Sequence, residues 1–205
     1  MLALSKLFGS IQRRINELPR GAKIFGAAVG TLVLFWPRKT APIKLDYINT
    51  STRDRWYGPI QFVPNPVPGN PEGIRITNDF EARNIVRKRF PLIGYAAIHK
   101  LAAPSLEAAL SEIQDSGLGD RVRTFAGGYY PRFVRKSTTN LSSHSYGTSI
   151  DINAGENPQG SPPTAEQAEL APIFAKHGWY WGENFSPTRD PMHFEYVLQP
   201  LGEIA

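Results

Sequence analysis

The chain has 205 residues, a net charge of +5 from 23 Lys and Arg against 18 Asp and Glu, and no cysteine. This length is enough for one domain with a sizeable core and a short additional segment. The lack of cysteine excludes disulfides and cysteine-ligated zinc, and it is compatible with a reducing or an oxidising compartment. The sequence has no arginine-rich helix and no alternation of basic and aromatic residues, so we do not expect nucleic acid as a partner.

Residues 1–40 have the pattern of an export signal. Residues 1–23 carry five basic side chains and one acid, and residues 24–36 form the uncharged run IFGAAVGTLVLFW. Basic residues followed by a short apolar run are typical of signal sequences. The run is shorter than the roughly 20 residues of a full span, and no small-x-small cleavage site follows it. We expect an uncleaved apolar helix that anchors an exported protein to the membrane; the alternative is a helix packed on the domain.

Residues 41–72 are predicted to be a linker that leads into the domain, because they are rich in Pro, Asn and Gly. The domain itself is expected to span residues 73–205. Asn78 and Asp79 predict the start of a helix that runs to about Arg89. A second helix is predicted to begin near Pro104, where a core-facing stripe repeats at helical spacing. The stripe consists of Leu106, Ala109, Leu110 and Ile113.

Shorter elements are predicted in the second half of the chain. Residues 122–126 read as a strand, and Thr164 with Gln167 has the spacing of a capping box that opens a third helix. Residues 149–153 and 193–198 alternate between apolar and polar side chains, which is typical of strands with one buried face. Strands and segregated helices together indicate an α+β fold.

Two of these stretches carry candidate metal ligands. Asp151 stands on the polar face of the first strand, and His144 lies seven residues before it, beyond Gly147. A glycine at that position lets the chain turn sharply, so that the imidazole and the carboxylate converge. His193 begins the second strand and offers a third ligand. Two imidazoles and one carboxylate suit Zn²⁺ and leave one position for water.

Asp190, three residues before His193, is a candidate general base. A carboxylate near the metal but not bound to it can take a proton from water and pass it to a leaving amine. The same ligand types occur in non-haem Fe(II) oxygenases, but there the first histidine and the carboxylate usually stand two residues apart. The six residues between His144 and Asp151 argue against that class.

The order S-x-H-x-x-G-x-x-x-D followed by D-x-x-H-F resembles the zinc D-alanyl-D-alanine carboxypeptidase and L-alanyl-D-glutamate endopeptidase family (peptidase family M15), most closely its VanY-like and endolysin-like members. Ser142, His144, Gly147 and Asp151 match the first motif, and Asp190 and His193 match the second. The run HGWYWG at residues 177–182 supports the match between the motifs, and the resemblance covers roughly residues 58–198.

This resemblance implies zinc bound by His144, Asp151 and His193, with Asp190 as general base and peptidoglycan stem peptides as substrate. It implies an antiparallel sheet with helices on one side, as in Hedgehog and DD-peptidase domains, and an exported cell-envelope enzyme or a phage lysis or virion protein. Arg132, and next Arg135, is the candidate for contacting substrate. Further support for ligands or substrate is expected from four residues: Ser142, Tyr146, Trp181 and Glu195.

Two other functions remain open at this point. The domain would be a non-catalytic, zinc-stabilised module that binds the cell wall if its base or its cleft were blocked. It would be a membrane-anchored assembly protein if it retained zinc poorly. Cleavage of purified peptidoglycan, assayed with and without a chelator, separates these functions from the peptidase.

Overall fold

The computed structural model describes residues 23–24, 34–35 and 44–200. The chain divides into two compact units, residues 1–41 and residues 42–205. In the first unit, β1 (Lys23–Ile24) pairs antiparallel with β2 (Leu34–Phe35). Most of the predicted apolar helix at residues 24–36 lies outside the described residues. In the ranges that the structure describes, no helix has the length and apolar character needed to cross a membrane.

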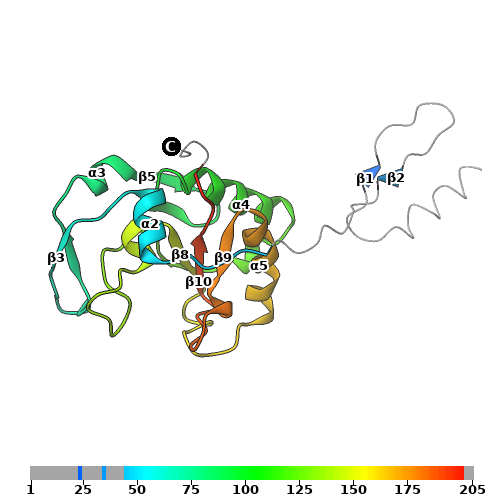
Figure 1. Ribbon diagram of the computed structural model, residues 1–205. Coiled ribbons are helices and arrows are strands. Elements are labelled where there is room, and N and C mark those ends of the chain that lie inside the picture. The colour runs from blue at the N-terminus through cyan, green and yellow to red at the C-terminus, as the bar shows by residue number, and fades with distance from the viewer. Residues whose placement is uncertain (1–22, 25–33, 36–43, 201–205) are drawn as a thin grey trace, which may run out of the picture. The chain divides into compact units, whose positions relative to one another are not determined.

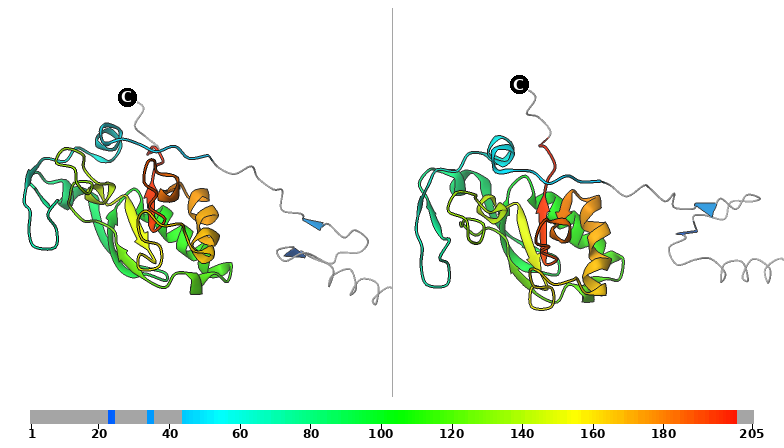
Figure 2. Two further views of the ribbon diagram at one scale, coloured as in Figure 1. Left: turned by 90° about the horizontal axis from the view of Figure 1, so that it is seen from below. Right: turned by 60° about the horizontal axis from the view of Figure 1, so that its bottom comes forward.

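The second unit is built on a four-stranded antiparallel sheet with the order β7-β8-β10-β9 (Figure 1). The strands are β7 (Phe125–Gly127), β8 (Ser149–Ile152), β9 (Trp179–Trp181) and β10 (His193–Tyr196). The two predicted strands that carry Asp151 and His193 are thus confirmed, and they are neighbours at the centre of the sheet. Figure 2 shows β8 and β10 side by side in two further views.

Helices α4 (Ala103–Asp115) and α5 (Ala165–Lys176) pack against one face of this sheet. The predicted stripe of α4 is buried, and Thr164 caps α5 by accepting a hydrogen bond from the backbone NH of Gln167. Both predicted helices are therefore confirmed. They enclose a core of fully buried side chains that includes Leu106, Leu110, Ile150, Ile152, Leu170, Phe174 and Phe194.

The predicted helix from residue 80 to about Arg89 is wrong beyond its first turn. Helix α3 (Phe80–Asn84) ends after five residues, and the chain continues as β5 (Ile85–Phe90), which pairs with β6 (Gly94–His99). Ile85 and Val86 are β-branched and favour an extended backbone. Six consecutive pairs with β6 complete this hairpin, so pairing with another segment overrides the helix start signal.

Residues 44–72, predicted as a linker, contain regular structure that belongs to the second unit. Helix α2 (Thr50–Tyr57) is followed by the antiparallel pair β3 (Phe62–Pro64) and β4 (Ile74–Ile76), which stands at the opposite end of this unit from α5 in Figure 1. A second buried cluster joins this part to the rest of the domain, and it includes Tyr57, Ile74, Phe80, Phe133, Tyr146 and Val197. The remaining helical turns are the 3-10 helices η1 (Gly119–Arg121), η2 (Ser143–Tyr146) and η3 (Gly182–Asn184).

Candidate metal centre

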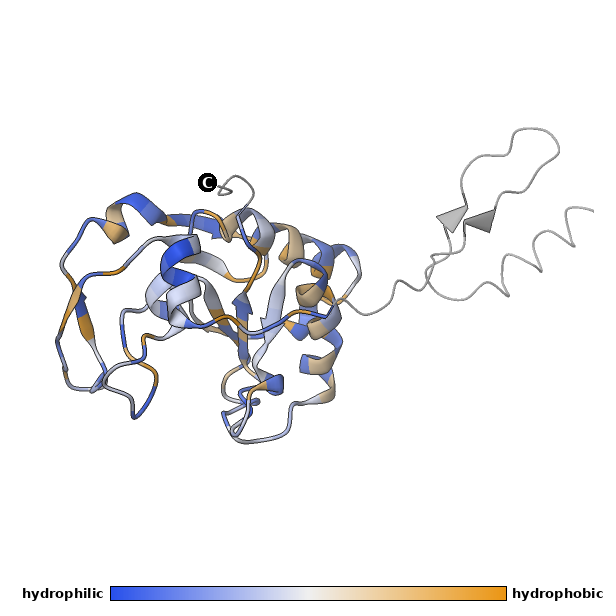
Figure 3. Ribbon diagram, viewed as in Figure 1, coloured by the Kyte–Doolittle hydropathy of each residue, from blue (hydrophilic) through white to orange (hydrophobic). Residues whose placement is uncertain are grey.

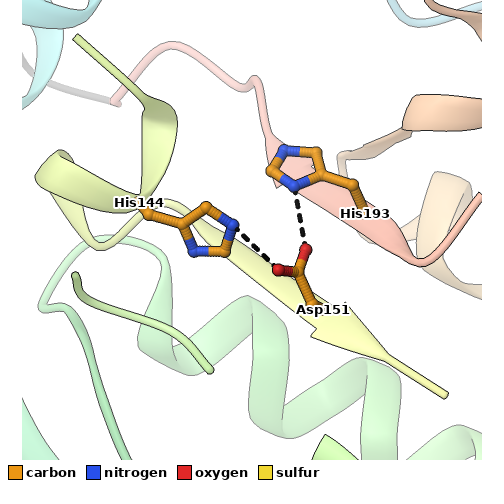
Figure 4. A group of neighbouring side chains, drawn as sticks. All are labelled: His144, Asp151 and His193. Atoms are coloured by element: carbon orange, nitrogen blue, oxygen red, sulfur yellow. Dashed lines mark hydrogen bonds and ion pairs between the residues drawn. The ribbon is translucent and has the colours of Figure 1, made fainter. Parts of the chain in front are cut away.

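The structure brings His144, Asp151 and His193 together, and Figure 4 shows the Asp151 carboxylate between the two imidazoles. In the sheet register, His193 of β10 stands directly opposite Asp151 of β8. His144 comes from η2, which turns into β8 at Gly147, where φ is +67°. The predicted turn at this glycine is thus confirmed. One ligand atom from each residue lies within 4.8 Å of the others, which is close enough to hold one metal ion. We call these three residues the metal group.

Backbone contacts fix the orientation of His144. Its Nδ1 donates a hydrogen bond to the Gly128 carbonyl at 2.7 Å. In the neutral ring, Nε2 therefore carries the lone pair. This Nε2 atom is buried without a hydrogen-bond partner and lies 3.2 Å from Asp151 Oδ2. Ser142 supports the same turn, because its side chain caps η2 and accepts a hydrogen bond from the His144 backbone NH at 3.3 Å.

His193 is oriented by side chains. Its Nδ1 lies 3.0 Å from Asp151 Oδ1, while its Nε2 faces Ser143 Oγ at 3.2 Å and Glu195 Oε2 at 3.4 Å. A hydrogen on Nε2 donated to these oxygens leaves the Nδ1 lone pair directed toward Asp151. A second carboxylate in this position commonly fixes the tautomer of a metal-bound histidine, which is the role expected for Glu195.

The electrostatics of the group favour a positive charge at its centre. Burial raises the pKa of Asp151, but the imidazoles of His144 and His193 outweigh this and hold the pKa well below its usual range. Burial lowers the pKa of His193, whereas hydrogen bonds with Asp151 and Glu195 raise it, with a net rise to about 10. A metal ion bound to His193 would displace this proton, because a ligand imidazole must be neutral.

Asp190 lies near this group without joining it. Its Oδ1 is buried with no hydrogen-bond partner, and its Oδ2 accepts a hydrogen bond from Gln159 Nε2 at 3.3 Å. Burial raises the pKa of Asp190, and the charge of Asp151 adds to this rise although His193 opposes it. A carboxylate with a raised pKa and a free oxygen is suited to accept a proton.

Arg132 is the partly buried member of the two candidate arginines, and Arg135 is exposed. Burial lowers the pKa of Arg132 and nearby Asp151 raises it, so the guanidinium is within electrostatic range of the metal group. Its backbone is held by Ser145, whose Oγ donates to the Arg132 carbonyl at 2.7 Å, and by a β-bridge to Gly73. Arg135 in turn lowers the pKa of Asp190 through its charge.

Two residues expected at the site have other surroundings. Tyr146 is fully buried in the second core cluster, where its hydroxyl donates to Asp54 Oδ1 at 2.5 Å. Trp181 pairs with Phe194 in the register and stacks on it with the ring centroids 6.1 Å apart, on the face opposite the metal group. Trp181, which was expected to support ligands or substrate, therefore lies on the core face of the sheet, because strand neighbours alternate between faces.

Two other aromatic side chains, Tyr180 and Phe185, lie on the side of the sheet that carries the metal group. Tyr180 pairs with Glu195 in the register, so it lies on the same face as the metal group. Phe185 stacks on Tyr180, and its ring centroid lies 5.5 Å from that of His193. The HGWYWG run predicted that aromatic residues lie near the site. Which of them face it depends on the register in which β9 pairs with β10.

The donor set and the orientation of these residues fit a zinc ion. Two imidazole nitrogens and a carboxylate are common zinc ligands. The orphaned Nε2 atom of His144 points into the group, and both rings are held through their second nitrogen. Such contacts usually orient histidines in metal sites. His144 and His193 are buried, and Asp151 is slightly exposed, which leaves a route to solvent.

One comparison with known proteins matches the segment that carries the metal group. Residues 135–196 match the family model described as D-alanyl-D-alanine carboxypeptidase. This segment contains all three residues of the metal group as well as Asp190, and the match supports a peptidase of the M15 family. No curated protein and no solved structure matches the chain significantly.

Proposed function

We propose that this protein is a zinc-dependent peptidase that hydrolyses peptide bonds in peptidoglycan stem peptides. The single observation that carries the proposal is the buried group of His144, Asp151 and His193 inside the segment that matches the carboxypeptidase family model. The proposed bond is either D-Ala-D-Ala, cut by a carboxypeptidase of the VanY-like kind, or L-Ala-D-Glu, cut by an endopeptidase of the endolysin-like kind.

In this proposal His144, Asp151 and His193 hold the zinc ion. A zinc ion bound there would lower the pKa of water and polarise the scissile carbonyl. Asp190 takes the proton of the attacking water and delivers it to the leaving amine, a role supported by its raised pKa and its unpartnered oxygen. Arg132 supplies a positive charge to the oxygen of the scissile carbonyl.

The role of Asp190 is tested by Asp190→Asn, which keeps the shape of the side chain. Loss of the general base should reduce turnover by about 10²–10⁴-fold while zinc content, measured by mass spectrometry of the metal, stays at the wild-type level. Asp115→Asn, at the exposed end of α4, is the matched control and should change neither quantity. Unchanged turnover in Asp190→Asn would refute the assignment.

The activity is tested on purified peptidoglycan, with and without a chelator and with zinc added back. The proposal predicts release of peptide fragments that stops on chelation and returns with zinc. Mass spectrometry of the fragments distinguishes loss of a terminal D-Ala from cleavage between L-Ala and D-Glu. Binding without cleavage would instead assign the protein as a wall-binding module.

The proposed substrate lies outside the cytoplasmic membrane, so we extend the proposal to a cell-envelope location or to a phage lysis or virion protein. The basic residues and apolar run of the first 40 residues are proposed to direct export and to attach the protein to the membrane. Fractionation of producing cells, followed by detection of the full-length chain, tests this location.

A further inference from the structure

A residue outside the two sequence motifs, Arg53, is linked to the metal group through Glu195. Arg53, on helix α2, pairs with Glu195 through Nη2 and Oε1 at 2.9 Å, and both side chains are 2% exposed. The other oxygen of Glu195 faces Nε2 of His193. A chain of contacts therefore runs from α2 through one carboxylate to a proposed metal ligand.

The burial of this pair indicates a specific task for it. Removing two charges from water costs free energy that a single hydrogen bond does not recover, and a hydrophobic pair of equal volume often stabilises a fold at least as well. Helix α2 is largely hydrophilic (Figure 3), and only Arg53 and Tyr57 of its residues are buried. The ion pair is therefore a poor explanation for stability and a better one for placing the Glu195 carboxylate.

Both ends of the pair are held in place. The Arg53 guanidinium carbon lies 5.1 Å from the centroid of the Tyr47 ring, a cation–π arrangement. The backbone of Glu195 is fixed at the centre of the sheet, between Ser149 and Tyr180 of the neighbouring strands. The position of one Glu195 oxygen on Arg53 thereby determines where the second oxygen meets His193.

Other contacts of α2 are independent of this pair. The Tyr57 hydroxyl donates to the carbonyls of Tyr196 and Leu198, at 3.2 and 3.0 Å. Asp54 accepts a hydrogen bond from the hydroxyl of Tyr146, at the end of η2. The helix would remain attached to the domain without Arg53, so the effect of Arg53 on the metal group can be separated from the attachment of α2.

We propose that Arg53 is a positioning residue of the metal site, which acts through Glu195 to hold the His193 ring with Nδ1 toward Asp151. If Arg53 has this role, helix α2 contributes to the site although it lies upstream of the matched residues 135–196. The inference rests on the proposed zinc site, because it assigns Arg53 a role in zinc affinity.

The test uses the full chain, stripped of metal and titrated with zinc against a chromophoric chelator. Loss of a contact that orients a ligand typically weakens metal affinity by about 10–100-fold, so Arg53→Met should weaken zinc binding at least about tenfold. Arg53→Lys, which keeps the charge on a shorter side chain, should fall between Arg53→Met and the wild type. Tyr57→Phe is the matched control, because it removes the hydrogen bonds of α2 to residues 196 and 198 but leaves the ion pair, and it should bind zinc like the wild type.

Two measurements separate positioning from a general loss of structure. Arg53→Met in a Glu195→Gln background should cause no further loss of zinc affinity beyond Glu195→Gln alone, because the path through Glu195 is already broken. Nitrogen-15 shifts of the imidazoles in the zinc-loaded protein should move for His193 and stay fixed for His144. If Arg53→Met does not fold, the comparison of Arg53→Lys with the wild type decides the question.

The outcomes distinguish this inference from the proposed function. Wild-type protein that binds no zinc overturns both. Wild-type zinc binding with equal affinity in the folded Arg53 variants overturns the role of Arg53 alone. An equal loss in Tyr57→Phe also overturns it, since the effect would then come from attachment of the helix.

Discussion

Strands β8 and β10 present side chains of opposite character to the two faces of one sheet. Toward α4 and α5 they place Ile150 and Phe194, which are fully buried in an apolar core. Toward the other face they place Asp151, His193 and Glu195, which are also largely removed from water. Burial of the apolar face stabilises the folded state. On the polar face, hydrogen bonds and ion pairs must offset the free energy lost when charged groups leave water. The same strands therefore supply an apolar core on one side and the candidate metal group on the other.

The largest effect on stability is expected from the apolar face. Ile150→Ala removes a fully buried side chain between two strands and leaves a cavity in the core. Substitutions of this kind typically cost about 2–5 kcal/mol. Urea denaturation should show this loss of unfolding free energy with an unchanged slope. A loss below about 1 kcal/mol would mean that this face does not form the principal core.

The buried histidine His99, which has no carboxylate partner among the described residues, predicts a dependence of stability on pH that contrasts with the surroundings of His193. His99 donates through Nε2 to the Tyr57 carbonyl at 2.9 Å and accepts at Nδ1 from the Leu101 NH at 3.2 Å, so the neutral ring satisfies both partners. Burial lowers its pKa from 6.5 to about 4. Its environment thus favours the neutral ring, whereas the surroundings of His193 favour the charged one.

The sign of the pH effect follows from this lowered pKa. Between pH 6.5 and about 4 the unfolded chain binds a proton at His99 that the folded protein does not. The contribution of His99 to the free energy of unfolding is therefore fully present above pH 6.5 and is lost as the pH falls to about 4. At ~1.4 kcal/mol per pKa unit the total loss is about 3 kcal/mol. Denaturation of the wild type and of His99→Gln across this range measures it. An equal loss in the variant would assign the effect to other groups.

The smallest effect is expected one residue from Ile150, on the polar face. Ser149 is fully buried and its Oγ has no hydrogen-bond partner. Removing an unsatisfied hydroxyl by Ser149→Ala should leave the unfolding free energy unchanged or raise it by up to about 1 kcal/mol. The pair of alanine variants at residues 149 and 150 compares the two faces directly. A large destabilisation at Ser149 would contradict the distinction between them.

The sequence predicted best where a local pattern also determines the three-dimensional arrangement. Alternation identified β8 and β10, and the glycine before β8 indicated the turn that brings His144 to Asp151. The apolar stripe of α4 and the Thr164 cap of α5 are likewise local signals. The proposed ligands could be found from sequence because each occupies such a position.

The rest depends on contacts between distant segments. Helix α2 has only two buried residues and no apolar stripe, so it is held by partners such as Glu195, 142 residues away. The face on which Trp181 lies depends on how β9 pairs with β10. Ser143, which contacts His193, lies inside the first motif at a position that the motif leaves open. None of these could be read from spacing alone.

The most direct test of the account is a crystal structure of the zinc-loaded protein with anomalous diffraction data collected on both sides of the zinc absorption edge. The account predicts one strong zinc peak in contact with His144, Asp151 and His193, and its loss in His193→Ala. A zinc peak elsewhere, or no peak at these three residues in the wild type, would contradict it.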